Sequence, residues 1–102
     1  MKATHIPLAL GIALLSLAPA GARDLGTFDT SAGKVRATEI TGDLAHPWGM
    51  AFLPDGGLLI TERDGNLRIL SGTTLSEPVA GVPKVAAAGQ GGLLDVAIAR
   101  DF

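Results

Sequence analysis

The chain has 102 residues, with 8 lysines and arginines against 10 aspartates and glutamates, and a formal net charge of −2 at pH 7. This near balance provides no basic surface for nucleic acid or for an anionic membrane. Cysteine is absent, which excludes a disulfide framework, a thiol nucleophile and a thiolate metal site. The two histidines, His5 and His46, are too far apart in sequence to indicate a metal cluster by themselves.

Residues 1–22, MKATHIPLALGIALLSLAPAGA, have the layout of a secretory signal peptide. Lys2 gives a positive start, residues 6–17 form an apolar core that is too short for a comfortable membrane span, and small residues follow. We expect cleavage after Ala20 or Ala22 and a periplasmic or secreted product without a stable membrane anchor. A retained N-terminal anchor is the alternative.

Residues 23–33, RDLGTFDTSAG, are polar and contain glycine, which is typical of a linker or N-terminal arm. The segment 34–41, KVRATEIT, alternates in a way that predicts a strand with neither face cleanly apolar. We place the start of the folded domain at residue 34 and extend it to residue 102.

Residues 47–79 predict an antiparallel meander. Three short apolar runs, at 49–53, 58–61 and 67–70, are separated by PDGG and RDGN, which contain the residues that tight turns demand. A fourth, weaker run covers 75–79. Runs this short and this regularly interrupted indicate strands rather than helices.

The apolar run at 92–98 looks like the first strand of another meander, and this spacing is typical of propeller blades. The predicted fold is therefore all-β, with about one blade of a β-propeller and the start of the next. Because propellers need about four to eight blades to close a ring, we expect the chain to be the N-terminal part of a longer protein. A small stand-alone sheet or half of a β-sandwich is the alternative.

Two stretches then carry a specific resemblance. Both lie within residues 44–102 and closely resemble the N-terminal part of soluble sugar dehydrogenases that depend on pyrroloquinoline quinone (PQQ). The two stretches are LAHPWGMAFLPDGGLLITERDGNLRIL and PVAGVPKVAAAGQGGLLDVAIARDF. These enzymes form the glucose/sorbosone dehydrogenase family, and the likeness is to its aldose dehydrogenase branch. The order of PWGMAFLPDG, TER and GQGGLLD carries the likeness, since a PDG turn alone occurs in many propellers.

The resemblance implies a six-bladed propeller that holds PQQ and calcium on its top face. It implies oxidation of the C1 hydroxyl of an aldose to a lactone, with a histidine general base, hydride transfer to the quinone and reoxidation by a respiratory or artificial acceptor. His46 does not fit the motif of that histidine, and no calcium-ligand motif of the family is visible. We therefore assign no catalytic residue and no metal ligand here, and expect this chain alone to be inactive. A non-catalytic secreted propeller that binds carbohydrate or protein is the competing hypothesis.

Gln90 is the position that the resemblance transfers, because the family places a glutamine in the loop that enters the second blade, at the mouth of the quinone and sugar site. Its amide can both donate to and accept from sugar hydroxyls or quinone oxygens. The flanking Gly89 and Gly91 would let a ligand approach the backbone. Alternatively, Gln90 only occupies a flexible turn.

Asp95 is a weaker candidate for a ligand contact on the first strand of the second blade, although a structural carboxylate that accepts backbone hydrogen bonds explains it as well. We predict that Glu62 and Arg63 form a partly exposed ion pair that braces loops.

Four further residues have structural interpretations. His46 orders the chain before the first strand of the blade, and Trp48 supplies most of the aromatic area that the blade can bury. Asp55 and Asp64 belong to turns, where their carboxylates are expected to cap local amides.

Overall fold

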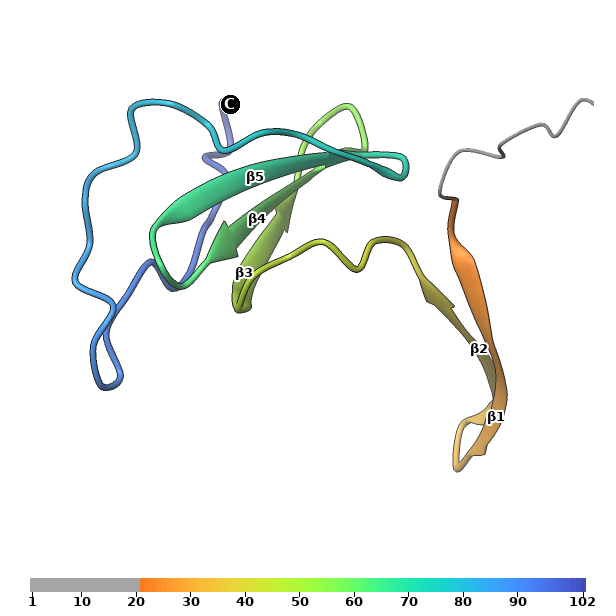
Figure 1. Ribbon diagram of the computed structural model, residues 1–102. Helices are drawn as coiled ribbons and strands as arrows, with labels where there is room; N and C mark the ends of the chain where they lie inside the picture. The colour runs from red at the N-terminus through yellow and green to blue at the C-terminus, as the bar shows by residue number, and fades with distance from the viewer. Residues whose placement is uncertain (1–20) are drawn as a thin grey trace, which may run out of the picture.

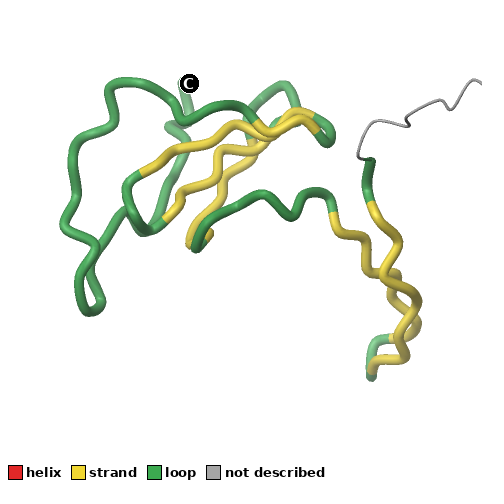
Figure 2. Tube along the Cα trace, in the orientation of Figure 1, coloured by secondary structure: helices red, strands yellow, loops and turns green. Residues whose placement is uncertain are grey.

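The computed structural model describes residues 21–102, and the predicted leader lies outside this range except for its last two residues. The described chain is all-β (Figures 1 and 2), with a two-stranded sheet and a four-stranded sheet. Within residues 21–102 no helix is long and apolar enough to cross a membrane.

The two-stranded sheet is a hairpin of β1 (Arg23–Thr30) and β2 (Gly33–Glu39), which projects away from the rest of the chain in Figure 1. Residues 23–33, expected to be a linker or N-terminal arm, thus contain a strand over 23–30 and the first residue of β2, which the sequence pattern did not predict. Every residue of β1 is exposed. The sequence carries no apolar alternation there because the hairpin is held by its backbone ladder, and neither face is buried.

The four-stranded sheet is the predicted meander. Its strands follow chain order, and each pairs antiparallel with the next. They are β3 (Pro47–Phe52), β4 (Leu58–Glu62), β5 (Asn66–Ser71) and β6 (Thr74–Leu75).

The turns explain why the meander forms where it does. Leu53 and Gly57 close the first loop through a 2.8 Å backbone hydrogen bond, and Asp55 caps the Gly57 amide at 2.9 Å, as predicted. The second loop has three residues and ends on Gly65, whose φ of 121° is a conformation that only glycine adopts readily. These turn residues set the register of β3, β4 and β5.

Two predicted strands differ from the structure. The fourth run, 75–79, is a strand only at Leu75, the last residue of β6, and two backbone bonds continue the contact with β5, from the Ser76 amide to the Ile69 carbonyl and from the Val79 amide to the Leu67 carbonyl. Residues 92–98 form no strand. A strand needs a partner ladder, and among residues 21–102 this segment makes no ladder with the sheet, although the Thr61 hydroxyl donates to the Leu94 carbonyl.

The core of the sheet is small. Ile60 and Leu70 are its buried apolar residues, at 6% and 4% exposure, and Thr61 and Glu62 beside them are each 1% exposed. The prediction that Trp48 is buried was wrong for this part of the molecule, because its side chain is 57% exposed. β3 is an edge strand, and no described segment covers its aromatic side chain.

Candidate functional site

Gln90 lies at the tip of a tight turn. The Gly91 amide donates to the Ala88 carbonyl at 2.8 Å, which leaves Gly89 and Gln90 as the two central residues. Gly89 has φ +57°, and such a positive φ at the first central position is required by a type II′ turn. The Gln90 side chain is exposed and makes no hydrogen bond to any of residues 21–102, so both ends of its amide are free to meet a ligand.

Arg63 holds this turn. Its Nη2 donates to the Gly89 carbonyl at 2.7 Å, and its Nε donates to the Gly91 carbonyl at 3.1 Å. Its own carbonyl accepts the Leu93 amide at 2.8 Å. One residue at the end of β4 therefore contacts the chain before and after Gln90.

The predicted ion pair between Glu62 and Arg63 was wrong. Adjacent side chains along an extended chain point to opposite sides, and here Glu62 meets Arg68 while Arg63 meets the turn. Sequence adjacency suggested the pair, and nothing in the sequence marked Arg68 as the true partner beyond its place on the next strand.

Steric contacts within the chain explain two of the glycines around Gln90, Gly91 and Gly92. A Cβ atom on Gly92 would lie 2.5 Å from the Arg63 carbonyl oxygen, and one on Gly91 would lie 3.0 Å from the Ala86 carbonyl oxygen. Gly91 and Gly92 are therefore needed for the chain to pack against itself. Of the glycines near Gln90, only Gly89 has open space around it.

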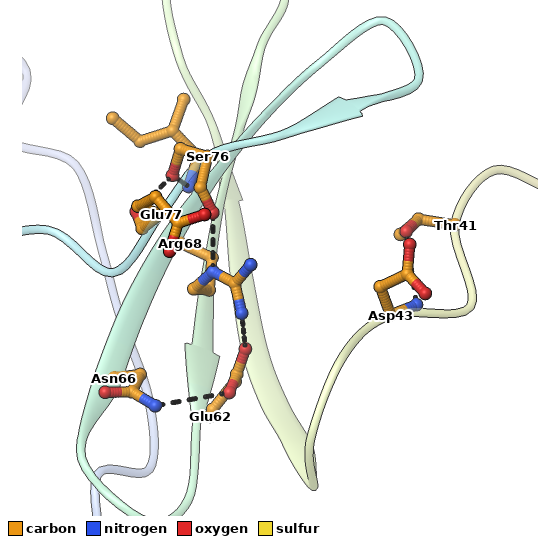
Figure 3. A network of polar contacts seen from close by, with 8 residues as sticks. Thr41, Asp43, Glu62, Asn66, Arg68, Ser76 and Glu77 are labelled. Atoms are coloured by element: carbon orange, nitrogen blue, oxygen red, sulfur yellow. Dashed lines mark hydrogen bonds and ion pairs between the residues drawn. The ribbon is translucent and has the colours of Figure 1, made fainter. Parts of the chain in front are cut away.

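Glu62 is the centre of a buried polar network, shown in Figure 3. Its carboxylate accepts from Arg68 Nη1 at 2.7 Å and from Asn66 Nδ2 at 3.5 Å. Arg68 Nε then donates to the Ser76 carbonyl at 2.7 Å, and the Ser76 hydroxyl donates to the Glu77 carbonyl at 2.8 Å. This network links β4, β5 and the segment after β6.

Thr61 connects the sheet to the segment after the Gln90 turn. Its hydroxyl accepts from the Gly49 amide at 2.9 Å and donates to the Leu94 carbonyl at 2.5 Å. Asp95, next along the chain, is exposed, and its carboxylate accepts the Val96 amide at 2.9 Å. A ligand contact by Asp95 stays a prediction.

His46 and Asp64 lie together at the surface, with His46 Nδ1 3.3 Å from a carboxylate oxygen of Asp64. The prediction that Asp64 caps a local amide was wrong, because its carboxylate contacts this imidazole instead. His46 has φ +48°, and its carbonyl accepts the Arg63 amide at 3.0 Å. It orders the chain before β3, in line with its structural interpretation.

Metal ligands do not gather in this part of the molecule. Among residues 21–102 no group of three or more His, Cys, Asp or Glu side chains is placed to hold a metal ion.

A four-stranded antiparallel meander such as β3 to β6 is the unit from which the blades of a β-propeller are built. The chain belongs to the glucose/sorbosone dehydrogenase family, whose model matches residues 44–102. That match spans the whole four-stranded sheet and the Gln90 turn. The family is a β-propeller family, and its members are generally quinone-dependent.

Two curated proteins are similar to the chain. It is 61% identical over 61 residues to the aldose sugar dehydrogenase YliI of Escherichia coli, covering 58% of this chain and 16% of that protein. It is 39% identical over 122 residues to the uncharacterized protein slr1608 of Synechocystis, covering 95% of this chain and 30% of that protein. The chain therefore spans less than a third of either relative. No solved structure matches it significantly.

Proposed function

We propose that this chain is the N-terminal part of a quinone-dependent aldose sugar dehydrogenase. The observation that carries the proposal is the continuous family match over residues 44–102, which includes both the sheet and the turn that presents Gln90. The 61% identity to the aldose sugar dehydrogenase of E. coli supports the aldose branch of the family.

Gln90 suits a site for a quinone and a sugar. Its exposed amide offers two N–H donors and an acceptor oxygen, which match the oxygens of an ortho-quinone and the hydroxyls of an aldose. PQQ, when bound, supplies the acceptor for the hydride that leaves C1 of the sugar. The role we propose for Gln90 is to bind and orient, by hydrogen bonds to a substrate hydroxyl or a quinone oxygen; Asp95 is a second, weaker candidate for such a contact.

The proton chemistry and the calcium belong to other parts of the longer protein in this proposal. His46 is exposed and already lies against Asp64, so we give it no catalytic role. Calcium binds through several oxygen ligands, carboxylates among them, and residues 21–102 bring no group of three or more His, Cys, Asp or Glu side chains together.

The proposal also includes the localisation of the protein and its partners. We infer, from the pattern of residues 1–22, that the protein is exported to the periplasm or beyond. Its partners would be a small aldose and an electron acceptor that reoxidises the quinol.

The test is the activity of the full-length protein. Purified protein, loaded with PQQ and calcium chloride, should oxidise aldoses such as glucose with reduction of an electron-accepting dye, and the protein without quinone should not. Gln90→Ala should lower kcat/KM about tenfold, the effect of losing one well-placed hydrogen bond. Absence of dye reduction across a panel of aldoses would refute the proposal, and sugar binding without oxidation would favour the non-catalytic propeller.

A further inference from the structure

The proposed dehydrogenase function gives Arg63 no role, although its side chain makes two hydrogen bonds to the Gln90 turn. We propose that Arg63 is a positioning residue, which fixes the turn 88–91 and thereby the direction in which Gln90 presents its amide. The effect on catalysis rests on the proposed dehydrogenase function, whereas the effect on the turn does not.

The contacts bracket Gln90 on both sides. The guanidinium donates to the carbonyl of Gly89, directly before Gln90, and to the carbonyl of Gly91, directly after it. The planar fork of an arginine can make two such bonds at once, whereas the single ammonium of a lysine cannot reproduce that geometry. The turn therefore loses freedom at the peptide group directly before Gln90 and at the one that follows Gly91.

The turn is anchored next to the most buried residues of the sheet. Arg63 directly follows Thr61 and Glu62, the two most buried side chains of the described chain. Its carbonyl accepts the Leu93 amide, and Gly92 packs so closely on its backbone that no larger residue fits there. Arg63 thus contacts the turn with its side chain and the following segment with its main chain.

A simple ion pair does not explain Arg63. Among residues 21–102 no carboxylate lies within ion-pair distance of its guanidinium, and its two side-chain bonds both go to backbone carbonyls of the Gln90 turn. The residue is half-buried, and its bond to the Gly91 carbonyl is partly shielded from water, which strengthens it, whereas the bond to the Gly89 carbonyl is exposed.

Hydrogen–deuterium exchange on the full-length protein tests the structural half. In Arg63→Ala, amides of residues 86–93 should exchange at least about tenfold faster than in the wild type, since two charge-assisted bonds are lost. Arg63→Lys should lie in between. The peptide covering 66–71 reports whether the sheet is intact, and Arg36→Ala, an exposed arginine on the distant β2 strand, is the matched control and should change neither peptide.

Kinetics with a double-mutant cycle test the positioning half. If Arg63 acts through Gln90, Arg63→Ala and Gln90→Ala should each lower kcat/KM, and the double variant should be no worse than Gln90→Ala alone. Losses that multiply would mean that Arg63 acts independently of Gln90, and would overturn the inference.

The two proposals can fail separately. If the loaded wild type oxidises no aldose, the dehydrogenase function fails, and the exchange comparison still decides whether Arg63 fixes the turn. Unchanged exchange at 86–93 in Arg63→Ala would overturn the inference whatever the activity, as would faster exchange with unchanged kcat/KM in an active enzyme.

Discussion

Glu62 illustrates how a single residue is decided by its neighbours. Its side chain is 2% exposed and is paired with Arg68, which is 16% exposed. Removing water from two charges is costly, and the pair is tolerated because further bonds from Asn66 and to Ser76 satisfy both groups. The polar network is complete: no buried side-chain nitrogen or oxygen of the described chain lacks a partner.

Removing one partner should therefore be severe. We expect Glu62→Ala to destabilise the full-length protein by about 3 kcal/mol or more, because it leaves the Arg68 charge half-buried and unpaired. Thermal unfolding measures this as a lower Tm. Replacing Glu62 and Arg68 together by apolar residues should restore part of the loss. Lys34→Ala breaks the exposed pair with Asp29 and should leave Tm nearly unchanged; an equal loss in both single variants would contradict the argument.

At the scale of elements, the segment after the Gln90 turn is held against β3 and β4 by close backbone approach rather than by a strand ladder. Gly49 of β3 faces the backbone of Leu94 and Asp95, and the Thr61 hydroxyl joins Gly49 to Leu94. The approach is possible only where β3 has no side chain. Gly49 is therefore one of the residues that fix the position of this segment.

Gly49→Ala tests that dependence. Its Cβ would lie 2.9 Å from the Leu94 carbonyl oxygen and 3.1 Å from the Asp95 Cα, so the segment must move. We expect a cost of about 1–3 kcal/mol, in the range of overpacked interiors, with faster amide exchange in residues 92–98. Gly42→Ala is the matched control, because its Cβ would meet only a side-chain oxygen of Glu39, at 3.8 Å. Equal behaviour of the two variants would refute the steric explanation.

At the scale of the whole molecule, the four-stranded sheet leaves a row of large apolar side chains exposed on β3. Trp48, Met50 and Phe52 of β3 are 57%, 63% and 71% exposed. An exposed apolar row of this kind on an edge strand promotes association with other sheets. In a propeller, neighbouring blades cover such surfaces.

Residues 23–102 expressed alone should consequently self-associate and lack a stable, cooperative fold. We expect them to bind a hydrophobic dye, to associate with rising concentration, and to show no aldose oxidation with added PQQ and calcium. Sedimentation and dye fluorescence measure the first two, and Trp48→Ser should reduce both. A monomer that unfolds in a sharp, cooperative transition would contradict this expectation.

The sequence alone was sufficient for β3, β4 and β5 of the meander. Glycine and aspartate define the turns at Gly65 and Asp55 through local backbone preferences, and such preferences are readable without knowing what lies nearby. The family match then assigns residues 44–102 to the glucose/sorbosone dehydrogenase family.

Only the tertiary structure decided the partners. Arg63 contacts carbonyls 26 and 28 residues away, and Glu62 pairs across strands rather than with its neighbour in sequence. The strand at 23–30 carries no apolar pattern because it buries nothing, and the apolar run at 92–98 is not a strand because no described segment completes its ladder. Turns follow from local sterics, whereas pairing depends on which distant segments the folded chain brings together.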